Sequence, residues 1–242
     1  VAVCRGVKVV DSAVRCKRQE RWNPAGGAIA HCRPERAEYH IRSMRKKPLN
    51  IGILGGTFNP VHLGHLVLAQ DAAERFRLDR VLLIPCAHPP HKRPDHLAPG
   101  RHRLAMLRKA VAGDPRFEVC SLEIERGGIS YSVDTLTELH RRYAGAKFFF
   151  IVGADMLPEL HTWRDIRRLM TLCTFVAVDR PGFGVASAPK GAKVRVFESH
   201  RVEVSSSDIR RRMRRGLNIR YLVPQAVEGY IRRHQLYGAK EN

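Results

Sequence analysis

The chain has 242 residues, of which 44% are hydrophobic, and its formal net charge is +20 at pH 7. That hydrophobic content supports a packed core and excludes a globally disordered chain. No apolar run reaches the roughly 18 residues that a membrane-spanning helix needs. The charge predicts an anionic ligand or partner.

The six cysteines include no C-x-x-C pair, which argues against a zinc ribbon or a redox motif. Free thiols in a reducing compartment are the simpler interpretation. The first ten residues, "VAVCRGVKVV", have a basic residue inside their only apolar stretch, which argues against a secretory signal. We therefore expect a cytoplasmic protein with no membrane partner.

Residues 1–47 differ in composition from the rest of the chain. They carry a net charge of +8, contain several proline and glycine breakers and show no sustained period of 2 or 3.6 residues. Two interpretations stay open: a disordered basic tail, or sequence that precedes a natural start at Met44. Under either one, residues 48–242 form a single compact domain and residues 1–47 a dispensable N-terminal extension.

From residue 50 onward, short apolar runs alternate with helical patterns. This alternation predicts an α/β fold of Rossmann-like type, with a doubly wound, mostly parallel sheet. The β-branched and aromatic residues of the runs suit strands that are buried on both faces. The expected strands are residues 50–55, 80–85, 117–120, 147–152, 173–178 and 193–197. The expected helices are residues 63–76, 100–112, 132–143, 155–170 with a break, 206–215 and 224–235.

Two segments rich in proline or glycine interrupt this alternation. Residues 85–99, "PCAHPPHKRPDHLAP", hold five prolines and three histidines, and residues 180–191 are rich in glycine and proline. Proline at this density excludes a helix or a paired strand. Ligands of open α/β sheets bind beyond the carboxyl ends of the strands, where these loops start. We therefore expect both loops near the ligand site.

The segment "GGTFNPVHLGHL", residues 55–66, joins the first predicted strand to the first predicted helix. Gly55 and Gly56 let the backbone approach a ligand without a Cβ, and the helix start offers free N–H groups and a positive dipole end to an anion. His62 and His65 lie there and can donate to phosphoryl oxygens. A metal pair and two ordinary surface histidines are the alternatives, although no carboxylate accompanies the histidines as in H-E-x-x-H. The pattern favours a phosphate site.

This segment also resembles the signature of the H-x-G-H nucleotidyltransferase superfamily, whose members transfer an adenylyl or cytidylyl group. The resemblance implies that the two histidines contact the nucleotide phosphates. It also implies that Gly55, Gly56, Thr57 and Phe58 belong to the ATP-binding loop. A nucleotidyl transfer is thus the expected reaction.

The segment "VSSSDIRRRM", residues 204–213, begins another predicted helix. Serine hydroxyls cap free N–H groups, so a plain N-cap with a solvated basic face is one interpretation. An anion site formed by Ser205, Ser206 and Arg210 is the other. The superfamily carries a matching Ser-Ser-Thr-x-Ile-Arg segment that binds the triphosphate, and the resemblance favours the anion site. Ser207 stands at the threonine position.

Residues 148–166, "FFFIVGADMLPELHTWRDI", place Gly153 and Asp155 after a predicted buried strand. Asp155 can cap the following helix or accept a hydrogen bond from a ribose hydroxyl, and the residues alone do not decide between these roles. Trp163 can be a core aromatic or a stacking platform.

This "GAD…TW" pattern, together with "GISYSVDT" at 128–135 and "PPHK" at 89–92, resembles the nicotinate-nucleotide adenylyltransferases, which make deamido-NAD. The similarity extends from about residue 50 to residue 238. It implies that the Gly-x-Asp segment contacts the adenosine. Carried over by position, Trp163 stacks on the nicotinate ring, and Tyr131 and Ser132 line the nicotinate pocket.

Four positions need comment against the family pattern. Asn59 replaces the more frequent aspartate, and its amide can bond the ribose or order the loop, without offering a charge. Lys92 matches a basic residue that reaches the phosphates, and Arg180 matches an arginine beside the adenine pocket. Arg164 stands where a second aromatic residue is common, which puts contacts at that position in doubt.

The resemblance implies that the 5′-phosphate of nicotinate mononucleotide attacks the α-phosphorus of ATP and that pyrophosphate leaves, without a covalent enzyme intermediate. His62, His65, Lys92 and Arg210 are the expected catalytic residues. Mg²⁺ is the expected cofactor, held mainly by the ATP phosphates, and no metal site of protein ligands is expected.

Three alternatives stay open. An adenylyltransferase acting on nicotinamide mononucleotide or on phosphopantetheine would use the same chemistry. A nucleic-acid-binding module would explain the charge, but the chain lacks the interleaved aromatic and basic residues of an RNA-recognition strand, so we expect no nucleic-acid partner. A catalytically inactive nucleotide sensor is the third, and the intact histidines argue against it.

Overall fold

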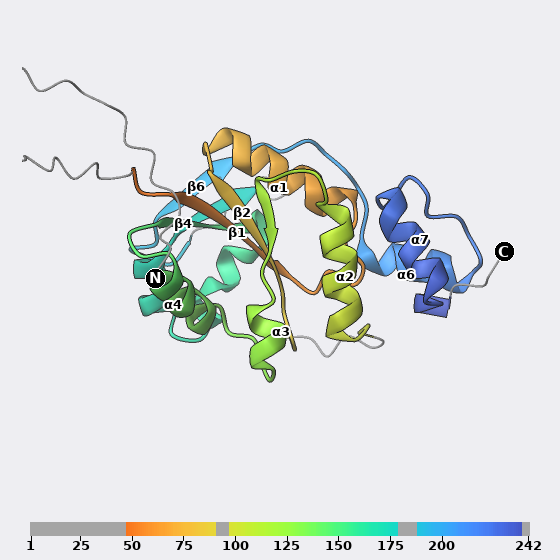
Figure 1. Ribbon diagram of the computed structural model, residues 1–242. Coiled ribbons are helices and arrows are strands. Elements are labelled where there is room, and N and C mark those ends of the chain that lie inside the picture. The colour runs from red at the N-terminus through yellow and green to blue at the C-terminus, as the bar shows by residue number, and fades with distance from the viewer. Residues whose placement is uncertain (1–46, 91–96, 179–187, 239–242) are drawn as a thin grey trace, which may run out of the picture. The chain divides into compact units, whose positions relative to one another are not determined.

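Six parallel strands form one sheet, in the order β3-β2-β1-β4-β5-β6 (Figure 1). The structure is a computed structural model that describes residues 47–90, 97–178 and 188–238. The order confirms the predicted doubly wound sheet, and each predicted strand appears within one residue of its expected bounds. The strands are β1 (Asn50–Gly56), β2 (Arg80–Pro85), β3 (Phe117–Val119), β4 (Lys147–Gly153), β5 (Thr174–Val178) and β6 (Val194–Phe197).

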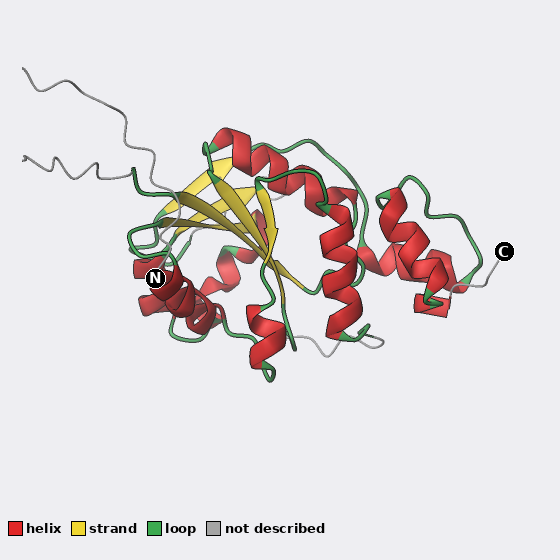
Figure 2. Cartoon of the chain, in the orientation of Figure 1, coloured by secondary structure: helices red, strands yellow, loops and turns green. Residues whose placement is uncertain are grey.

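Helices cover both faces of the sheet (Figure 2). Helices α1 and α2 lie on one face, where α7 packs on α2 and α6 joins the same hydrophobic cluster, and α3, α4 and α5 lie on the other face. Neighbouring strand residues such as Phe149 and Phe150 belong to opposite core clusters, as the alternation of side chains along a strand requires. The helices are α1 (Leu63–Arg75), α2 (Gly100–Ala110), α3 (Leu122–Arg126), α4 (Ser132–Arg142), α5 (Ile166–Leu172), α6 (Ser206–Arg214) and α7 (Gln225–Arg233).

The break predicted within residues 155–170 is confirmed, but the α-helix expected on its N-terminal side is wrong. Two short 3₁₀ turns, η1 (Ala154–Met156) and η2 (Pro158–Thr162), stand there instead, and α5 begins only at Ile166. Trp163 has an extended backbone, and Asp165 has a left-handed one with φ of 46°. Both conformations break an α-helix. The Asp165 side chain then caps α5 by accepting from the Arg168 N–H at 3.4 Å.

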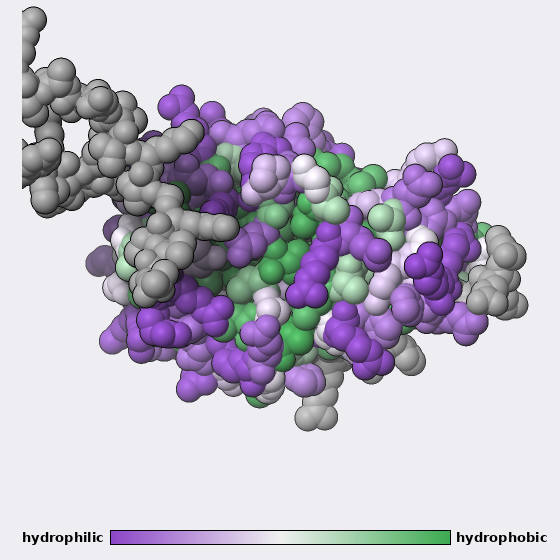
Figure 3. All heavy atoms as spheres, in the orientation of Figure 1, coloured by the Kyte–Doolittle hydropathy of each residue, from purple (hydrophilic) through white to green (hydrophobic). Residues whose placement is uncertain are grey.

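The strand order reverses its direction between β1 and β4. The chain winds from β1 outward to β2 and β3, and then returns to β4 beside β1 before it winds outward to β5 and β6. The connecting loops therefore separate at the carboxyl ends of β1 and β4, which opens a crevice there. In the face that Figure 3 shows, apolar side chains gather in the middle and hydrophilic ones surround them. Among the described residues, no helix is both long and apolar enough to span a bilayer.

Candidate active site

A cavity of about 520 Å³ lies beyond the carboxyl ends of β1 and β4, at the reversal of the strand order. Its volume falls within the roughly 300–1,000 Å³ of small-molecule sites. The cavity brings together seven of the residues that the sequence analysis singled out. They are Gly55, Gly56, Thr57, Tyr131, Ser132, Gly153 and Trp163.

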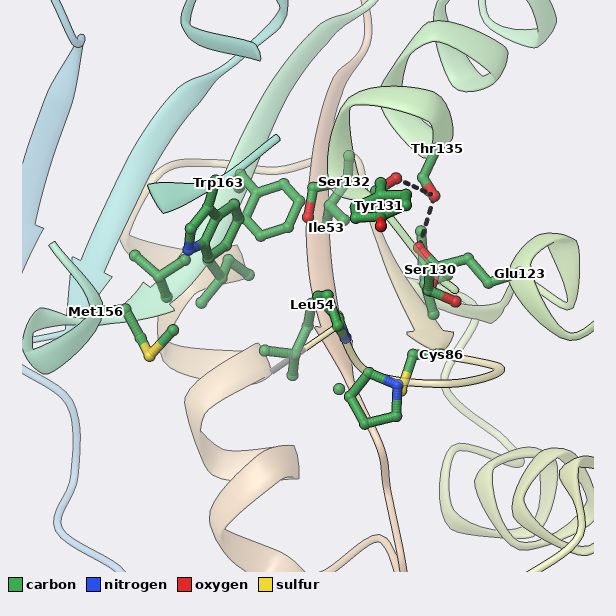
Figure 4. Close-up of a pocket in the computed structure, with 18 of the residues that line it drawn as sticks. Ile53, Leu54, Cys86, Glu123, Ser130, Tyr131, Ser132, Thr135, Met156 and Trp163 are labelled. Carbon is green, nitrogen blue, oxygen red and sulfur yellow. Dashed lines mark hydrogen bonds between the residues drawn. The ribbon is translucent and has the colours of Figure 1, made fainter. Parts of the chain in front are cut away.

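Two aromatic side chains stand on opposite sides of this cavity (Figure 4). Trp163 follows η2 and packs edge-on against Phe150, with the ring centroids 5.7 Å apart. Tyr131 is the N-cap residue of α4, which begins at Ser132. The unpaired N–H groups and the positive dipole end of α4 therefore lie at the cavity wall. This wall suits a ligand group with negative charge, and Trp163 offers a planar face to a ring.

Arg164 also lines the cavity, at the position where the family pattern has a second aromatic residue. Its guanidinium lies 4.5 Å from the centroid of the Tyr131 ring, within the range of a cation–π contact, and 3.7 Å from the carboxylate of Asp134. A positive charge thus lies beside the Tyr131 ring. The departure from the family pattern therefore adds a cation to the wall that α4 provides.

A buried carboxyl that the sequence analysis missed braces the same wall. Glu123 accepts a hydrogen bond from the Thr135 hydroxyl at 2.6 Å (Figure 4). Thr135 accepts in turn from Arg126 at 3.1 Å. The Ser130 hydroxyl donates to Glu123 and accepts from the Ala87 N–H at 2.9 Å. Burial raises the pKa of Glu123, and the two hydroxyl donors and Arg126 oppose that rise.

The two histidines of the H-x-G-H segment stack at the start of α1. His62 is the N-cap residue and His65 follows in the first turn, with ring centroids 3.7 Å apart. The His62 backbone N–H donates to Nδ1 of His65 at 3.3 Å. A neutral imidazole with an acceptor at Nδ1 carries its proton on Nε2. His65 therefore presents an Nε2–H donor.

Both imidazoles are neutral at pH 7. Burial lowers the pKa of His62 from 6.5 to about 4. Burial, followed by the neighbouring His62, lowers the pKa of His65 from 6.5 to about 3. Among the described residues, Nδ1 of His62 is the one buried side-chain polar atom without a hydrogen-bond partner. An unsatisfied buried polar atom at a helix start indicates a site that a ligand completes.

The neutral histidines predict a pH-dependent stability. Below pH 6.5 the unfolded chain binds protons at both histidines, whereas the folded chain stays neutral there until about pH 4. The free energy of unfolding is therefore expected to fall as the pH drops from 6.5 to 4, by up to about 1.4 kcal/mol per pH unit for each histidine. Urea unfolding at several pH values measures this slope. A His62→Gln, His65→Gln double variant with an unchanged slope would contradict the prediction.

Gly64, between the two histidines, is favoured by close contacts. A Cβ at this position would lie 3.1 Å from Nδ1 of His62 and 3.3 Å from the carbonyl oxygen of Val202, so these neighbours would have to shift by a few tenths of an ångström. Gly153 at the end of β4 is less constrained, because the atom that a Cβ would meet there at 2.2 Å is Oδ1 of Asp155, the end of a flexible and exposed side chain. Close packing therefore explains the glycine at position 64 only.

The loop between β1 and α1 is held by the C-terminal part of the chain. Arg210 donates to the Asn59 carbonyl at 2.8 Å, and the Ser206 hydroxyl donates to the Pro60 carbonyl at 2.8 Å. The Asn59 side-chain oxygen accepts from the Tyr237 hydroxyl at 2.7 Å. Segments about 150 residues apart thus meet at the loop that carries the histidines.

Asn59 and Phe58 contribute to this loop from inside the protein. Each side chain is 1% exposed, and neither lines the cavity. Besides Tyr237, the Asn59 side-chain oxygen accepts from the Ala98 N–H at 3.1 Å. Of the two roles expected for the Asn59 amide, its contacts fit the ordering of the loop. The Phe58 ring packs 4.9 Å from that of His65, so it supports the histidine from behind.

Other predicted site residues are placed as follows. Ser205 is the N-cap of α6 and accepts from the Asp208 N–H at 3.1 Å, which confirms the predicted helix start. Asp155 is exposed, does not line the cavity and makes no capping hydrogen bond in η1. Lys92 and Arg180 lie outside the described residues.

Comparison with known proteins decides the family. A family model described as cytidylyltransferase-like matches residues 53–212. A Thermus thermophilus protein described as "Probable nicotinate-nucleotide adenylyltransferase" is 48% identical over 189 residues, which cover 78% of this chain and 100% of that protein. A Corynebacterium kroppenstedtii protein with the same description is 45% identical and covers 77% of this chain and 90% of its own length. The chain belongs to the nicotinate-nucleotide adenylyltransferase family.

Family membership confirms the resemblance that the H-x-G-H and "GAD…TW" segments indicated. The fold of a more distant adenylyltransferase agrees as well. The structure of Plasmodium falciparum nicotinic acid mononucleotide adenylyltransferase complexed with NaAD has a TM-score of 0.67 and 18% identity, and covers 80% of this chain and 100% of that chain. The shared fold includes the parallel sheet at whose switch point the cavity lies.

Proposed function

We propose that this protein transfers the adenylyl group of ATP to nicotinate mononucleotide, giving deamido-NAD and pyrophosphate. One observation carries the proposal. One cavity lies between Trp163 and the start of α4, and it extends along the glycine ends of β1 and β4 to Thr57. Thr57 begins the loop that carries His62 and His65, although neither histidine lines the cavity. A pyridine ring fits against Trp163 while its carboxylate meets the helix start. The names of the relatives support the same activity.

Catalysis in this proposal consists of positioning and charge stabilisation. The 5′-phosphate of the mononucleotide is already a nucleophile, so its in-line attack on the α-phosphorus needs no general base. His65 donates from Nε2 to an oxygen whose charge grows as the bond to pyrophosphate breaks. His62, stacked on His65, contacts the phosphates beside it. Arg210 places its positive charge beside the same loop, where it donates to the Asn59 carbonyl. Lys92 completes the proposed catalytic set.

The proposed ATP site uses the remaining predicted residues. Gly55, Gly56 and Thr57 bring the backbone close to the phosphates, since all three line the cavity. Ser205 and Ser206 stand at the start of α6, whose dipole favours an anion. In the adenosine part of the site, we propose contacts from Gly153, Asp155 and Arg180. Asp155 would accept from a ribose hydroxyl, since its carboxylate is exposed.

Mg²⁺ is proposed as the cofactor and would supply charge neutralisation on the phosphates. Within the described part of the chain, no group of three or more His, Cys, Asp or Glu side chains could hold a metal ion. The donors at the start of α1 are imidazoles, whereas Mg²⁺ prefers oxygen ligands. Phosphate oxygens and water are therefore the proposed ligands. We also propose a cytoplasmic location, because the cysteines are most simply explained as free thiols in a reducing compartment.

The test is release of pyrophosphate from ATP and Mg²⁺ with nicotinate mononucleotide or its amide analogue as the acceptor. We expect kcat/KM to favour the acid by about tenfold or more, because its carboxylate meets the α4 start and the Arg164 cation. Preference for the amide would keep the chemistry and overturn the assignment of the nicotinate pocket. No release with either acceptor, from folded protein that binds ATP, would overturn the proposed function.

A further inference from the structure

One buried arginine joins two loops that border the cavity. Arg103 lies on α2, and its side chain is 2% exposed. Its Nε donates to the Ala98 carbonyl at 2.9 Å. Its Nη1 donates to the carbonyls of Thr57 at 3.0 Å and Cys86 at 2.7 Å, and Nη2 donates to that of Ala87 at 3.4 Å. These four hydrogen bonds all end on loop carbonyls, and the guanidinium also bonds the Cys86 side chain.

These carbonyls come from separate parts of the sequence. Thr57 follows β1, Cys86 and Ala87 follow β2, and Ala98 precedes α2. Thr57 and Cys86 themselves line the cavity, so the guanidinium lies directly behind the cavity wall. The planar fork of an arginine holds its donors at fixed angles. One side chain thus fixes the loop after β1 relative to both ends of the segment that joins β2 to α2.

Helix packing does not account for a charge at this position. Met106 and Leu107 are fully buried and already anchor α2 in the core. Among the described residues, Arg103 forms no ion pair, and burial lowers the pKa of its guanidinium. An apolar side chain of similar volume in place of a buried charge is often neutral or stabilising. The charge is therefore better explained by the loops that it bonds.

We infer that Arg103 is a positioning residue for the adenylyl transfer. Through the carbonyls of Thr57, Cys86 and Ala98, it holds the phosphate-binding loop after β1 in register with the segment after β2. The Asn59 side chain reinforces this arrangement, because it accepts from the Ala98 N–H at 3.1 Å. The inference rests on the proposed function, since that function assigns the phosphates to the loop after β1.

The test compares Arg103→Lys and Arg103→Met with a control, Val176→Ala. Lysine keeps the charge but cannot hold four carbonyls at fixed angles, and methionine keeps much of the volume without any donor. Val176 is fully buried in β5 and does not line the cavity, so its truncation measures the effect of lower stability alone. All kinetics are measured well below the melting temperature of each variant.

For Arg103→Lys we expect kcat to fall about 30-fold with KM changed less than about threefold, because bound substrates would be held slightly out of line. Arg103→Met should lose at least as much if it folds. Amide hydrogen exchange should become faster at Cys86 and Ala98 in both variants. The control should keep its kcat and the exchange rates of these two amides.

Two results would overturn the inference. One is a kcat of Arg103→Lys equal to that of the wild-type protein, and the other is a kcat loss in Val176→Ala as large as in the arginine variants. A wild-type protein that releases no pyrophosphate would overturn the proposed function instead. In that case hydrogen exchange still decides whether Arg103 orders the two loops, since it needs no turnover.

Discussion

His65→Gln is expected to lower kcat for adenylyl transfer by about 10²- to 10³-fold, which is the usual cost of removing one preorganised donor from a developing charge. The ATP KM should change only a few-fold, because the donation strengthens as the bond to pyrophosphate breaks. Glutamine is chosen because an acceptor at the third helical position can still take the His62 N–H, which His65 takes in the native protein at 3.3 Å. Steady-state kinetics of pyrophosphate release measure both constants.

Two further variants separate catalysis from folding. His65→Ala removes the cap as well as the imidazole, so it should lose the same activity and also lower the melting temperature. His140→Gln is the matched control, because His140 bonds the Leu172 carbonyl at 2.8 Å, between α4 and α5, and does not line the cavity. It should keep its full kcat. Near-normal kcat in His65→Gln would show that the imidazole does not stabilise the transition state.

Trp163→Ala is expected to raise the KM for nicotinate mononucleotide about 100-fold, with the ATP KM almost unchanged. Stacking on an aromatic side chain contributes about 1–3 kcal/mol per base, and Trp163, which lines the cavity, is the proposed platform for the pyridine ring. The ratio of kcat/KM for the acid to kcat/KM for the amide should stay the same. Stacking acts on the ring that both mononucleotides share and not on the carboxylate or amide group. Titration of the mononucleotide at saturating ATP gives the KM.

Trp163→Phe serves as the comparison for this prediction. A phenylalanine keeps an aromatic face beside Phe150, so most of the affinity should remain. The competing interpretation is a core aromatic, which the edge-on contact with Phe150 also allows. Under that interpretation Trp163→Ala would lower the melting temperature and leave the KM unchanged, and the stacking role would be wrong.

The fold could be predicted from the sequence because its strands are short apolar runs with β-branched and aromatic residues, separated by clear breakers. Where local signals were weak, the prediction was wrong or missing. Pro158 and the left-handed Asp165 break residues 155–170 into turns, although the apolar spacing there resembles a helix. Helix α3 has five residues, which is too short to show a period of 3.6.

Site residues could be predicted only where the neighbouring sequence itself indicates their role. The histidines and glycines of residues 55–66 indicate a phosphate site, whereas Glu123 and Arg103 act through partners distant in sequence. One signal could have indicated Arg103: Met106 and Leu107 follow it by three and four positions, which puts it on the buried stripe of α2. Nothing local distinguishes Glu123 from an exposed glutamate, since its partners Thr135 and Ser130 are known only from the fold.

The hydrogen bonds that hold Asn59 and Pro60 come from Arg210, Ser206 and Tyr237, which are 146 to 178 residues further along the chain. During translation the loop that carries the histidines is made early, and the residues that hydrogen-bond to it are made last. The nascent chain can therefore pair all six strands while the loop still lacks its partners. Translation products that stop before α6 would contain the whole sheet and none of these three partners, and we expect them to be inactive. We therefore expect activity to appear only after the segment from α6 to Tyr237 is made, long after the last strand.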